Sequence, residues 1–389
     1  MKKVTFVLLF IFVLVAQACH RSDFETVSSV LKGGIVESAQ AWLVREPVTI
    51  TDFPAVRSAG GIHDFYSEGD YWWPDPENPD GPYIRRDGES NPDNFTAHRK
   101  AMVDFSMAVG SLTSAFLITG DRKYALAVEK HVRAWFIDEK TRMNPSLLYA
   151  QAIKGVVTGR GIGIIDTIHL MEVAQSLRRL RDAGAISEEC LDGAKRWFSL
   201  YLDWLTSHEY GIAEMNAKNN HGTCWALQAA SFARFTGSKE ILGLCRTRFK
   251  EVFIPGQMAA DGSFPQELSR TKPYGYSLFN LDAMAVLCHI LSEEGEDMWS
   301  YSTEDGLCMR KAVDFMLPFV QDKKLWNYGE DVMYWDEWPV AQPAFLFAWV
   351  RFKESDYYRA WKGHEHFPTN PEVLRNLPVR NPLIWLDRR

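Results

Sequence analysis

Two apolar segments decide the fold class: AMVDFSMAVGSLTSAFLIT at 101–119 and KYALAVEKHVRAWF at 123–136. In both segments apolar residues recur at steps of three and four, which is the period of a helix that buries one or more faces. The short turn TGD at 119–121 joins them, and a glycine followed by a polar residue is typical of such a helix boundary. The stretch therefore predicts an antiparallel helix hairpin.

The same period returns along most of the chain, at 164–182, 189–206, 224–235, 238–253, 278–293, 308–320 and 341–352. Short turns join these segments, and no Asn-Gly or Asp-Gly hairpin lies between alternating strands. Many helix hairpins without strand–helix alternation predict an all-α fold. Because no strict residue repeat accompanies them, we expect an incomplete (α/α) barrel or toroid with a central cleft. One such barrel is expected to make up residues 19–389.

The segment 60–97 interrupts the helical pattern. It carries prolines at 74, 76, 79, 82 and 92 and glycines at 69, 81 and 88. That density is incompatible with a helix or a central strand. Its content of aromatic residues argues against disorder, since disordered segments contain few of them. We predict an ordered, non-helical lid loop across the mouth of the barrel. The aromatic and acidic segment 327–343 is either a second wall of the cleft or an ordinary turn between helices.

The N-terminal segment MKKVTFVLLFIFVLVAQAC has two lysines, an apolar run and small residues that end at Cys19. This pattern indicates an export signal, because the apolar run is too short to span a membrane and polar sequence follows. The ending resembles a bacterial lipoprotein box, which predicts cleavage after residue 18 and a lipid on Cys19. An ordinary signal peptidase site is the alternative. We expect a periplasmic or outer-membrane lipoprotein of a Gram-negative bacterium, attached to the membrane only through the lipid.

The amino-acid composition limits the classes of partner that the protein is expected to bind. The net charge of −7 and the lack of a dominant basic run argue against nucleic acid. The 14 tryptophans and 23 phenylalanines suit a large core, and in an exported protein some of them commonly line a groove for sugars. Five cysteines besides Cys19 are widely spaced, which indicates mainly buried thiols with at most one or two disulfides. No metal-binding motif is present, so we expect no cofactor, and the protein is expected to be a monomer.

Three groups of polar residues are candidates for chemistry. KNNHGTCW at 218–225 places Asn220 and His221 at the start of a predicted helix, where Asn220 alone would be read as a helix cap. FPQELSRTKPYGYSLFNLDAM at 264–284 holds Arg270 and Tyr276, which alone would be a surface residue and a packing residue. A third group, in and after the lid loop, would alone be a solvated charged turn: Arg85, Arg86, His98, Arg99 and Lys100.

Together these residue types match one reaction, the β-elimination of a uronic acid polysaccharide. The C5 proton lies α to a carboxylate, so its removal requires that the carboxylate be neutralised by donors such as an amide and a guanidinium. A base must take the C5 proton and an acid must protonate the O4 leaving group, roles that suit histidine and tyrosine. A neighbouring arginine is expected to lower the pKa of the tyrosine toward that of a base.

The motifs resemble those of the alginate lyase superfamily. NNH followed by an aromatic residue, with ELSR and a later tyrosine, resembles polysaccharide lyase family 5. SEGDYWWPDPENPDGPYIRRDG with RTKPYGYSLFNL is more similar to polysaccharide lyase family 38, whose members have an (α/α) barrel and act on alginate or glucuronan. The resemblance covers about residues 60 to 350. It departs from family 5 at GTCW and in an Arg-to-Tyr spacing that is one residue shorter.

The resemblance implies roles for individual residues. Asn220 and Arg270 neutralise the carboxylate at the +1 subsite. Tyr276 protonates O4 and also takes the proton from mannuronate, where C5–H and O4 lie on the same side, whereas His221 takes it from guluronate. The shorter spacing leaves Tyr274 as a competing tyrosine. Further contacts with the polymer are expected from residues of the lid loop and the helix after it: Tyr71, Trp72, Trp73, Arg85, Arg86, His98, Arg99 and Tyr274.

Two other classes of protein compete with the lyase. A glycoside hydrolase on the same barrel would need two catalytic carboxylates, for which the candidates are Asp70, Glu214, Glu267 and Asp331. A surface glycan-binding lipoprotein would need the aromatic residues but no converging Asn, His, Arg and Tyr. The sequence leaves open alginate or glucuronan, mannuronate or guluronate, and endo or exo action. We expect Trp225, four residues after His221, to pack behind the site.

Overall fold

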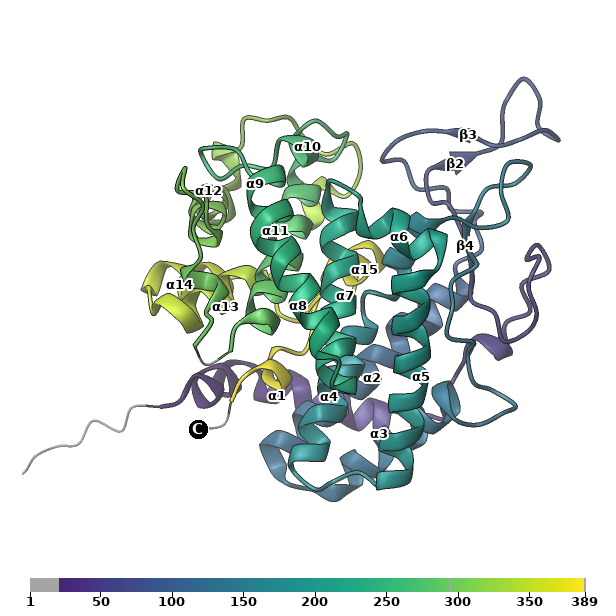
Figure 1. The fold of residues 1–389 in the computed structure, drawn as a ribbon, viewed down its shortest axis with the longest axis horizontal. Helices are drawn as coiled ribbons and strands as arrows, with labels where there is room; N and C mark the ends of the chain where they lie inside the picture. The colour runs from purple at the N-terminus through teal and green to yellow at the C-terminus, as the bar shows by residue number, and fades with distance from the viewer. Residues whose placement is uncertain (1–20, 294, 388–389) are drawn as a thin grey trace, which may run out of the picture.

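The computed structural model describes residues 21–293 and 295–387 and shows two layers of helices (Figure 1). The predicted signal peptide and Cys19 lie outside the described residues. The inner layer is a row in which each helix packs on the next: α2 (Ala97–Thr119), α4 (Leu170–Asp182), α7 (Asn220–Thr236), α11 (Pro273–Leu291) and α13 (Pro343–Phe352). In the described part of the chain, the predicted all-α toroid of antiparallel hairpins is confirmed.

The outer layer covers the inner row from one side. Its helices are α1 (Asp23–Leu43), α3 (Arg122–Phe136), α5 (Glu188–Ser207), α8 (Lys239–Arg248), α12 (Met309–Gln321) and α14 (Ser355–Lys362). The C-terminal segment, with the 3₁₀ helix η7 (Pro382–Trp385), packs against α1, α2 and α4. Buried apolar side chains from Phe24 to Leu386 form one cluster between the layers. Because α2, α7 and α11 are buried around most of their circumference, their sequences are apolar on nearly every face.

Among the described helices, α2 is the one long and apolar enough to cross a membrane. Its most apolar stretch is 83% buried in the protein, as is usual for a core helix. The cysteines at 190, 224, 245, 288 and 308 are all free thiols, and the first four of them are buried. The prediction of mainly buried thiols is therefore confirmed, and none of these five forms a disulfide.

The turns predicted to be helix boundaries contain a glycine that ends one helix and a polar residue that caps the start of the next. Helix α2 ends at Gly120 in the left-handed conformation (φ 73°), and the Asp121 carboxylate accepts from the backbone N–H of Lys123 at the start of α3. Helix α7 ends in the same way at Gly237 (φ 93°), and Ser238 caps α8. A residue with a Cβ adopts this backbone conformation at a cost, so glycine fixes where each helix stops.

Two glycine substitutions are expected to change stability in opposite directions. Gly237→Ala should lower the free energy of unfolding by about 1 kcal/mol, because alanine is strained at a left-handed φ even though no atom lies within 4 Å of the new Cβ. Gly243→Ala, in the middle of α8 with equally open space, should raise it by about 0.5–1 kcal/mol, since alanine favours a helix. Denaturant unfolding of both variants measures the difference. Equal effects would contradict the backbone explanation.

The long helix α1, before the segment 60–97, was not predicted. Several short helices were also not predicted: α6 (Glu209–Met215), α9 (Ile254–Gln257), α10 (Pro265–Leu268) and α15 (Pro371–Asn376). The 3₁₀ helices are η1 (Ile50–Asp52), η2 (Gly161–Thr167), η4 (Met298–Ser300), η5 (Lys323–Leu325) and η6 (Trp335–Glu337), and η3 (Phe249–Phe253) is a π-helix that continues α8. A helix of four to seven residues is too short to show a full period in sequence.

The segment 60–97 is ordered and non-helical, but it is not free of strands. Strand β1 (Tyr66–Glu68) is buried and pairs in parallel with β4 (Tyr149–Ala152), and β2 (Trp72–Trp73) pairs antiparallel with β3 (Ile84–Arg85). Figure 1 shows β2, β3 and β4 at one edge of the helical layers, near α6. The expectation that no buried strand forms here was wrong, because β1 lies before the first proline of the segment, Pro74, and its partner strand is distant in sequence.

Candidate active site

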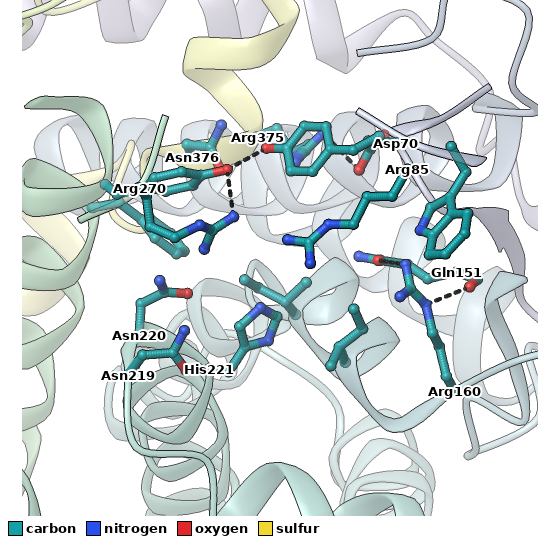
Figure 2. A pocket seen from close by; sticks show the side chains of 16 residues that line it. Asp70, Arg85, Gln151, Arg160, Asn219, Asn220, His221, Arg270, Arg375 and Asn376 are labelled. Carbon is teal, nitrogen blue, oxygen red and sulfur yellow. Dashed lines mark hydrogen bonds and ion pairs between the residues drawn. The ribbon is translucent and has the colours of Figure 1, made fainter. Parts of the chain in front are cut away.

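A cavity of about 240 Å³ opens where α7 and α11 begin (Figure 2). One wall comes from the first turn of α7 and the opposite wall from Arg270 and the first turn of α11, and residues of the segment 60–97 complete it. The polar side chains that line it are Asp70, Tyr71, Arg85, Gln151, Arg160, Asn219, Asn220, His221, Arg270, Tyr276, Arg375 and Asn376. The structure thus brings Asn220, His221, Arg270 and Tyr276 together from segments about fifty residues apart.

The start of α7 is not capped in the way the sequence suggested. Asn219 is the N-cap residue, and its side chain makes no cap hydrogen bond. Instead, the Glu267 carboxylate accepts from the Asn220 backbone N–H (2.8 Å) and from its side-chain Nδ2 (2.7 Å). The reading of Asn220 as a side-chain cap was therefore wrong. Because an amide nitrogen carries two hydrogens, one N–H of Asn220 remains to face the cavity.

His221 is held from behind by a second buried carboxylate. Its Nδ1 lies 2.5 Å from Oε1 of Glu214, at the end of α6. A carboxylate only accepts, so Nδ1 carries the proton and Nε2 is left for the cavity. Burial by itself lowers the pKa of His221, but the charge and hydrogen bond of Glu214 outweigh burial, and the pKa lies above its usual value. Trp225 is fully buried and donates to the Leu205 carbonyl, which confirms that it packs behind the site.

The opposite wall is a chain of three side chains. The hydroxyl oxygens of Tyr276 and Tyr71 are 2.6 Å apart, and Nη2 of Arg270 donates to Tyr276 Oη at 3.4 Å. The Arg270 guanidinium also lies over the Tyr276 ring, 4.4 Å from its centroid. Figure 2 shows Arg270 across the cavity from Asn220 and His221.

The charge state of Tyr276 differs from the sequence-based expectation. Burial is the largest influence on its pKa and raises it, and the neighbouring Tyr71 raises it further. Arg270 lowers the pKa but does not outweigh these effects, so the pKa is well above the usual value. The expectation of a lowered pKa was wrong because sequence reveals the nearby arginine but not the burial. A neutral phenol suits a proton donor.

Asp87, in the segment 60–97, holds the guanidinium groups of Arg270 and Arg85 in place. Its carboxylate accepts from Nε (3.2 Å) and Nη2 (2.9 Å) of Arg270, from Thr271 Oγ1 (3.0 Å) and from Arg85 Nη2 (2.5 Å). Burial alone would raise the pKa of Asp87, but the hydrogen bonds from Arg270, Thr271 and Arg85 lower it to about 2. The carboxylate therefore stays ionised and fixes the direction of the Arg270 guanidinium.

Four arginines surround the cavity: Arg85, Arg160, Arg270 and Arg375. The Asp70 carboxylate beneath them is buried and pairs with Arg375 (3.0 Å) and with Arg99 (2.6 Å). Burial would raise the pKa of Asp70, yet the two guanidinium charges keep it below the usual value. The cavity is consequently basic although the whole chain carries a net charge of −7, which favours an anionic ligand.

The sequence analysis missed several cavity residues, and three of them carry polar or charged groups with clear partners: Gln151, Arg160 and Arg375. Arg160 donates to the Gln151 side chain (3.1 Å) and backbone carbonyl (2.9 Å), and its guanidinium lies over the Trp72 ring. Gln151 adopts a positive φ of 48°, which is strained for a residue with a Cβ and is common at functional sites. No local motif marks any of the three. A non-glycine residue at positive φ has no sequence signature.

Other predicted binding residues lie outside the cavity. Trp73 donates to the Glu89 carbonyl, and Arg86 lies over its ring. His98 is buried and bonds the backbone of Tyr66 and Phe53, so it holds the chain rather than a ligand. Arg99 is also buried and forms ion pairs with Asp70 and Asp166. The expectation for His98 and Arg99 was wrong, because both side chains are buried and sequence proximity to the loop does not fix the direction of a side chain. Contact of Trp73 and Arg86 with the polymer stays a prediction.

Tyr274 is also placed away from the cavity. Its side chain is 0% exposed, and its hydroxyl donates to the Phe319 carbonyl at 3.0 Å. The ring packs edge-on against Trp326 and Trp335. Side chains two positions apart in a helix point in directions that differ by about 200°. Tyr274 and Tyr276 therefore point to different sides of α11. Of the two tyrosines, only Tyr276 lines the cavity.

The carboxylates that a hydrolase would need are all engaged. Glu214 is hydrogen-bonded to His221, and Glu267 is hydrogen-bonded to Asn220. Asp70 forms ion pairs with arginines. Asp331 accepts hydrogen bonds from the N–H groups of Tyr274 and Gly275 at the start of α11. All four are less than 9% exposed. Of the four, only Asp70 lines the cavity, whereas glycoside hydrolysis requires two carboxyl groups that flank the scissile bond.

The segment 327–343 contacts the segment 60–97 but does not line the cavity. The Val332 N–H donates to the Thr271 carbonyl, and the Ser90 N–H donates to the sulfur of Met333. Its Trp335 packs against Tyr274. The segment 327–343 thus connects the loop that holds Thr271 with the loop that holds Ser90, beside the cavity. It is also the turn between two helices.

Comparisons with known proteins bear on the family and on the fold. A family model described as alginate lyase matches residues 49–326. The crystal structure of an alginate lyase from Bacteroides ovatus is 30% identical, with a TM-score of 0.79, over 93% of this chain and 97% of that one. Alginate lyase A1-III from Sphingomonas species A1 is 14% identical, with a TM-score of 0.55, over 91% and 94% of the two chains, and supports the fold alone. A search of curated proteins by sequence finds no match.

Proposed function

This chain belongs to the alginate lyase family, and from that premise we propose that it cleaves alginate by β-elimination at the cavity between α7 and α11. The family and the similar structure from Bacteroides ovatus make it a polysaccharide lyase. The observation that carries the proposed site is the convergence of Asn220 and His221 on one wall with Arg270 and Tyr276 on the other. These residue types provide what β-elimination from a uronic acid needs.

Neutralisation of the substrate carboxylate is assigned to Arg270 and Asn220. Loss of the C5 proton places negative charge on the carboxylate, so donors aimed at its oxygens lower the barrier. Arg270 is oriented by Asp87, and Asn220 by Glu267, before substrate arrives. Because both donors are fixed in advance, little reorganisation is needed in the transition state.

Proton transfer is assigned to Tyr276 and His221. Tyr276 is a neutral phenol at neutral pH, which suits protonation of O4 as the glycosidic bond breaks. To take the C5 proton of mannuronate, Tyr276 must first release its phenolic proton to solvent; the phenolate then takes the C5 proton, and the phenol so formed protonates O4 as the glycosidic bond breaks. Tyr71 at 2.6 Å and Arg270 at 3.4 Å are then the donors that stabilise the phenolate. His221 faces the cavity from the other wall and takes the proton when C5–H lies on the opposite side from O4, as in guluronate.

The remaining cavity residues extend the binding surface along the polymer. Arg85, Arg160 and Arg375 provide charges for the carboxylates of neighbouring sugars, and a polymer of uronic acids carries one carboxylate on each. Trp72 and Tyr71 present aromatic rings to the same cavity. An aromatic ring against the apolar face of a pyranose is a common means of holding sugars.

A panel of polymers tests this function directly. Purified protein is incubated with polymannuronate, polyguluronate, glucuronan and hyaluronan, and the ultraviolet absorbance of the new 4,5-double bond is followed. Absorbance should rise with at least one of the two alginate blocks, and the products should be unsaturated oligosaccharides by mass spectrometry. Reducing ends without absorbance would instead identify a hydrolase. Binding without any new ends would identify a glycan-binding protein.

A further inference from the structure

A second cavity lies at the end of the inner helices opposite the active site. It has a volume of about 370 Å³, and residues near the C-terminal ends of α4, α7, α11 and α13 line it together with Trp385 and Asp387. We propose that this cavity is a non-catalytic binding site for an acidic sugar, whose carboxylate is held by Arg178 and Arg234. The choice of ligand rests on the proposed lyase function, whereas the site itself does not.

The second cavity is separate from the active site. Along α7, Arg234 follows His221 by 13 residues, which at a rise of 1.5 Å per residue places them about 20 Å apart. The same length of α11 separates His289, in the second cavity, from Tyr276. Among the described residues, none lines both cavities. A ligand in the second cavity therefore does not contact the groups assigned to β-elimination.

The charges that line the second cavity do not balance. Each of the four carboxylates there has an arginine partner: Asp182 with Arg181, Glu293 with Arg246, Asp297 with Arg351, and Asp387 with Arg179. Arg178 and Arg234 also line the cavity, and neither forms an ion pair with any described carboxylate. The cavity therefore carries two guanidinium charges that the described part of the chain does not neutralise.

Several hydrogen-bond donors in this cavity have no acceptor. Arg178 donates from Nη1 to the Gln175 side chain (2.9 Å), but its buried Nε has no partner among the described residues. Arg234 is half-buried and makes no hydrogen bond within the described part of the chain. The buried Nε1 of Trp385 also lacks an acceptor there. Buried donors are normally paired, and water satisfies an N–H but balances no charge, so these groups indicate an anionic ligand.

The ends of the helices do not account for these two arginines. A helix C-terminus carries partial negative charge, which favours an arginine in the last turn, as Arg234 is in α7. That attraction is small beside the cost of burying an unpaired charge. Burial, together with the charge of Arg234, lowers the pKa of Arg178 to about 10, and burial also lowers the pKa of Arg234. The surroundings thus supply too little negative charge for both groups, and a bound anion would supply it.

The walls of the cavity favour a sugar acid over a phosphate. Trp299, Phe347 and Val350 give it an apolar side next to the arginines. A uronic acid joins a pyranose ring, which has an apolar face, to one carboxylate that accepts two hydrogen bonds from a guanidinium. A phosphate would leave the apolar side uncovered, and its second negative charge would face the four carboxylates. The polymer proposed as the substrate consists of such sugars.

Mannuronate monosaccharide is the probe for this site, because it has one carboxylate and no glycosidic bond to cleave. Calorimetry of the wild-type protein, Arg270→Gln and Arg234→Gln separates the two cavities. One equivalent of mannuronate should persist in Arg270→Gln and should bind at least about tenfold more weakly in Arg234→Gln, as expected when a charged donor is removed. Mannose, which lacks the carboxylate, should not bind there. Arg196→Gln, at an exposed position of α5, is the matched control and should bind normally.

Thermal unfolding distinguishes a binding role of Arg234 from a structural one. Because Arg234 has no partner in the described part of the chain, Arg234→Gln should keep or raise the Tm without ligand, and mannuronate should raise the Tm of the wild type more than that of the variant. A lower Tm of the variant, mannuronate binding that it does not weaken, or binding of inorganic phosphate in place of mannuronate would each overturn the inference. If no polymer yields a double bond, the proposed function fails instead, and calorimetry still tests the second cavity.

Discussion

Replacing Tyr276 with phenylalanine is expected to lower kcat on polymannuronate by about a thousandfold. General acid–base catalysis contributes about 10²–10⁴-fold to a rate, and Tyr276 is assigned both proton transfers on this substrate. The ring that lies under the Arg270 guanidinium is kept, so substrate affinity should change little. Stopped-flow or steady-state absorbance of the unsaturated product measures kcat, and calorimetry with a short oligomer measures binding.

Two tyrosine variants provide the controls for this experiment. Tyr274→Phe removes a hydroxyl that bonds the Phe319 carbonyl in the core, so it should cost about 1 kcal/mol of stability and leave kcat unchanged. Tyr71→Phe removes the hydrogen-bond partner of Tyr276 and should give an intermediate loss of activity. A Tyr276→Phe protein with normal activity, or an inactive but folded Tyr274→Phe protein, would reverse the assignment of the catalytic tyrosine.

Replacing Arg270 with glutamine is expected to lower kcat/KM by about 10²–10³-fold, which is the usual effect of removing one donor to a developing negative charge. Arg270 contacts Tyr276 and is held by Asp87, so its guanidinium both faces the substrate carboxylate and stabilises a phenolate at Tyr276. Arg270→Lys keeps the charge but loses the two-pronged geometry, and it should recover only part of the activity. Product absorbance over a range of polymer concentrations separates kcat from KM.

Arg86→Gln is the matched control for Arg270. Arg86 is another arginine beside the site, but its guanidinium lies over the Trp73 ring outside the cavity. Its replacement should leave kcat within about twofold, as is usual for side chains away from the chemistry. Thermal unfolding of each variant checks that Asp87, which retains Arg85 and Thr271 as partners, still holds the loop in the Arg270 variant. Equal losses in the two variants would indicate a general charge effect rather than a specific contact.

Much of the fold was predictable because it depends on residues that are close together in the sequence. The apolar period at 101–119 and 123–136 corresponds to α2 and α3, and the glycine turns at 120 and 237 end their helices. Burial of an apolar face and the freedom of glycine at positive φ act over a few residues, so sequence shows them. Strand β1 was not predictable, because three residues form a strand only when β4, eighty residues away, supplies the hydrogen bonds.

The candidate site, like the fold, was predictable from the sequence only in part. The residue types of Asn220, His221, Arg270 and Tyr276 and their motifs were visible in the sequence. Their common cavity and the selection of Tyr276 over Tyr274 were not, since a difference of two residues in a helix register decides whether a phenol faces substrate or core. Arg160 and Arg375 were missed because nothing near them in sequence resembles a site.

By itself, the sequence determined the helical toroid, the family and the kinds of group available for β-elimination. These depend on local period and on motif, which are properties of neighbouring residues. Only the tertiary structure decided the charge states: Tyr276 is neutral because it is buried, His221 is paired with Glu214, and Arg270 is fixed by Asp87. A pKa depends on desolvation and on charges brought together from distant segments, and packing alone creates both.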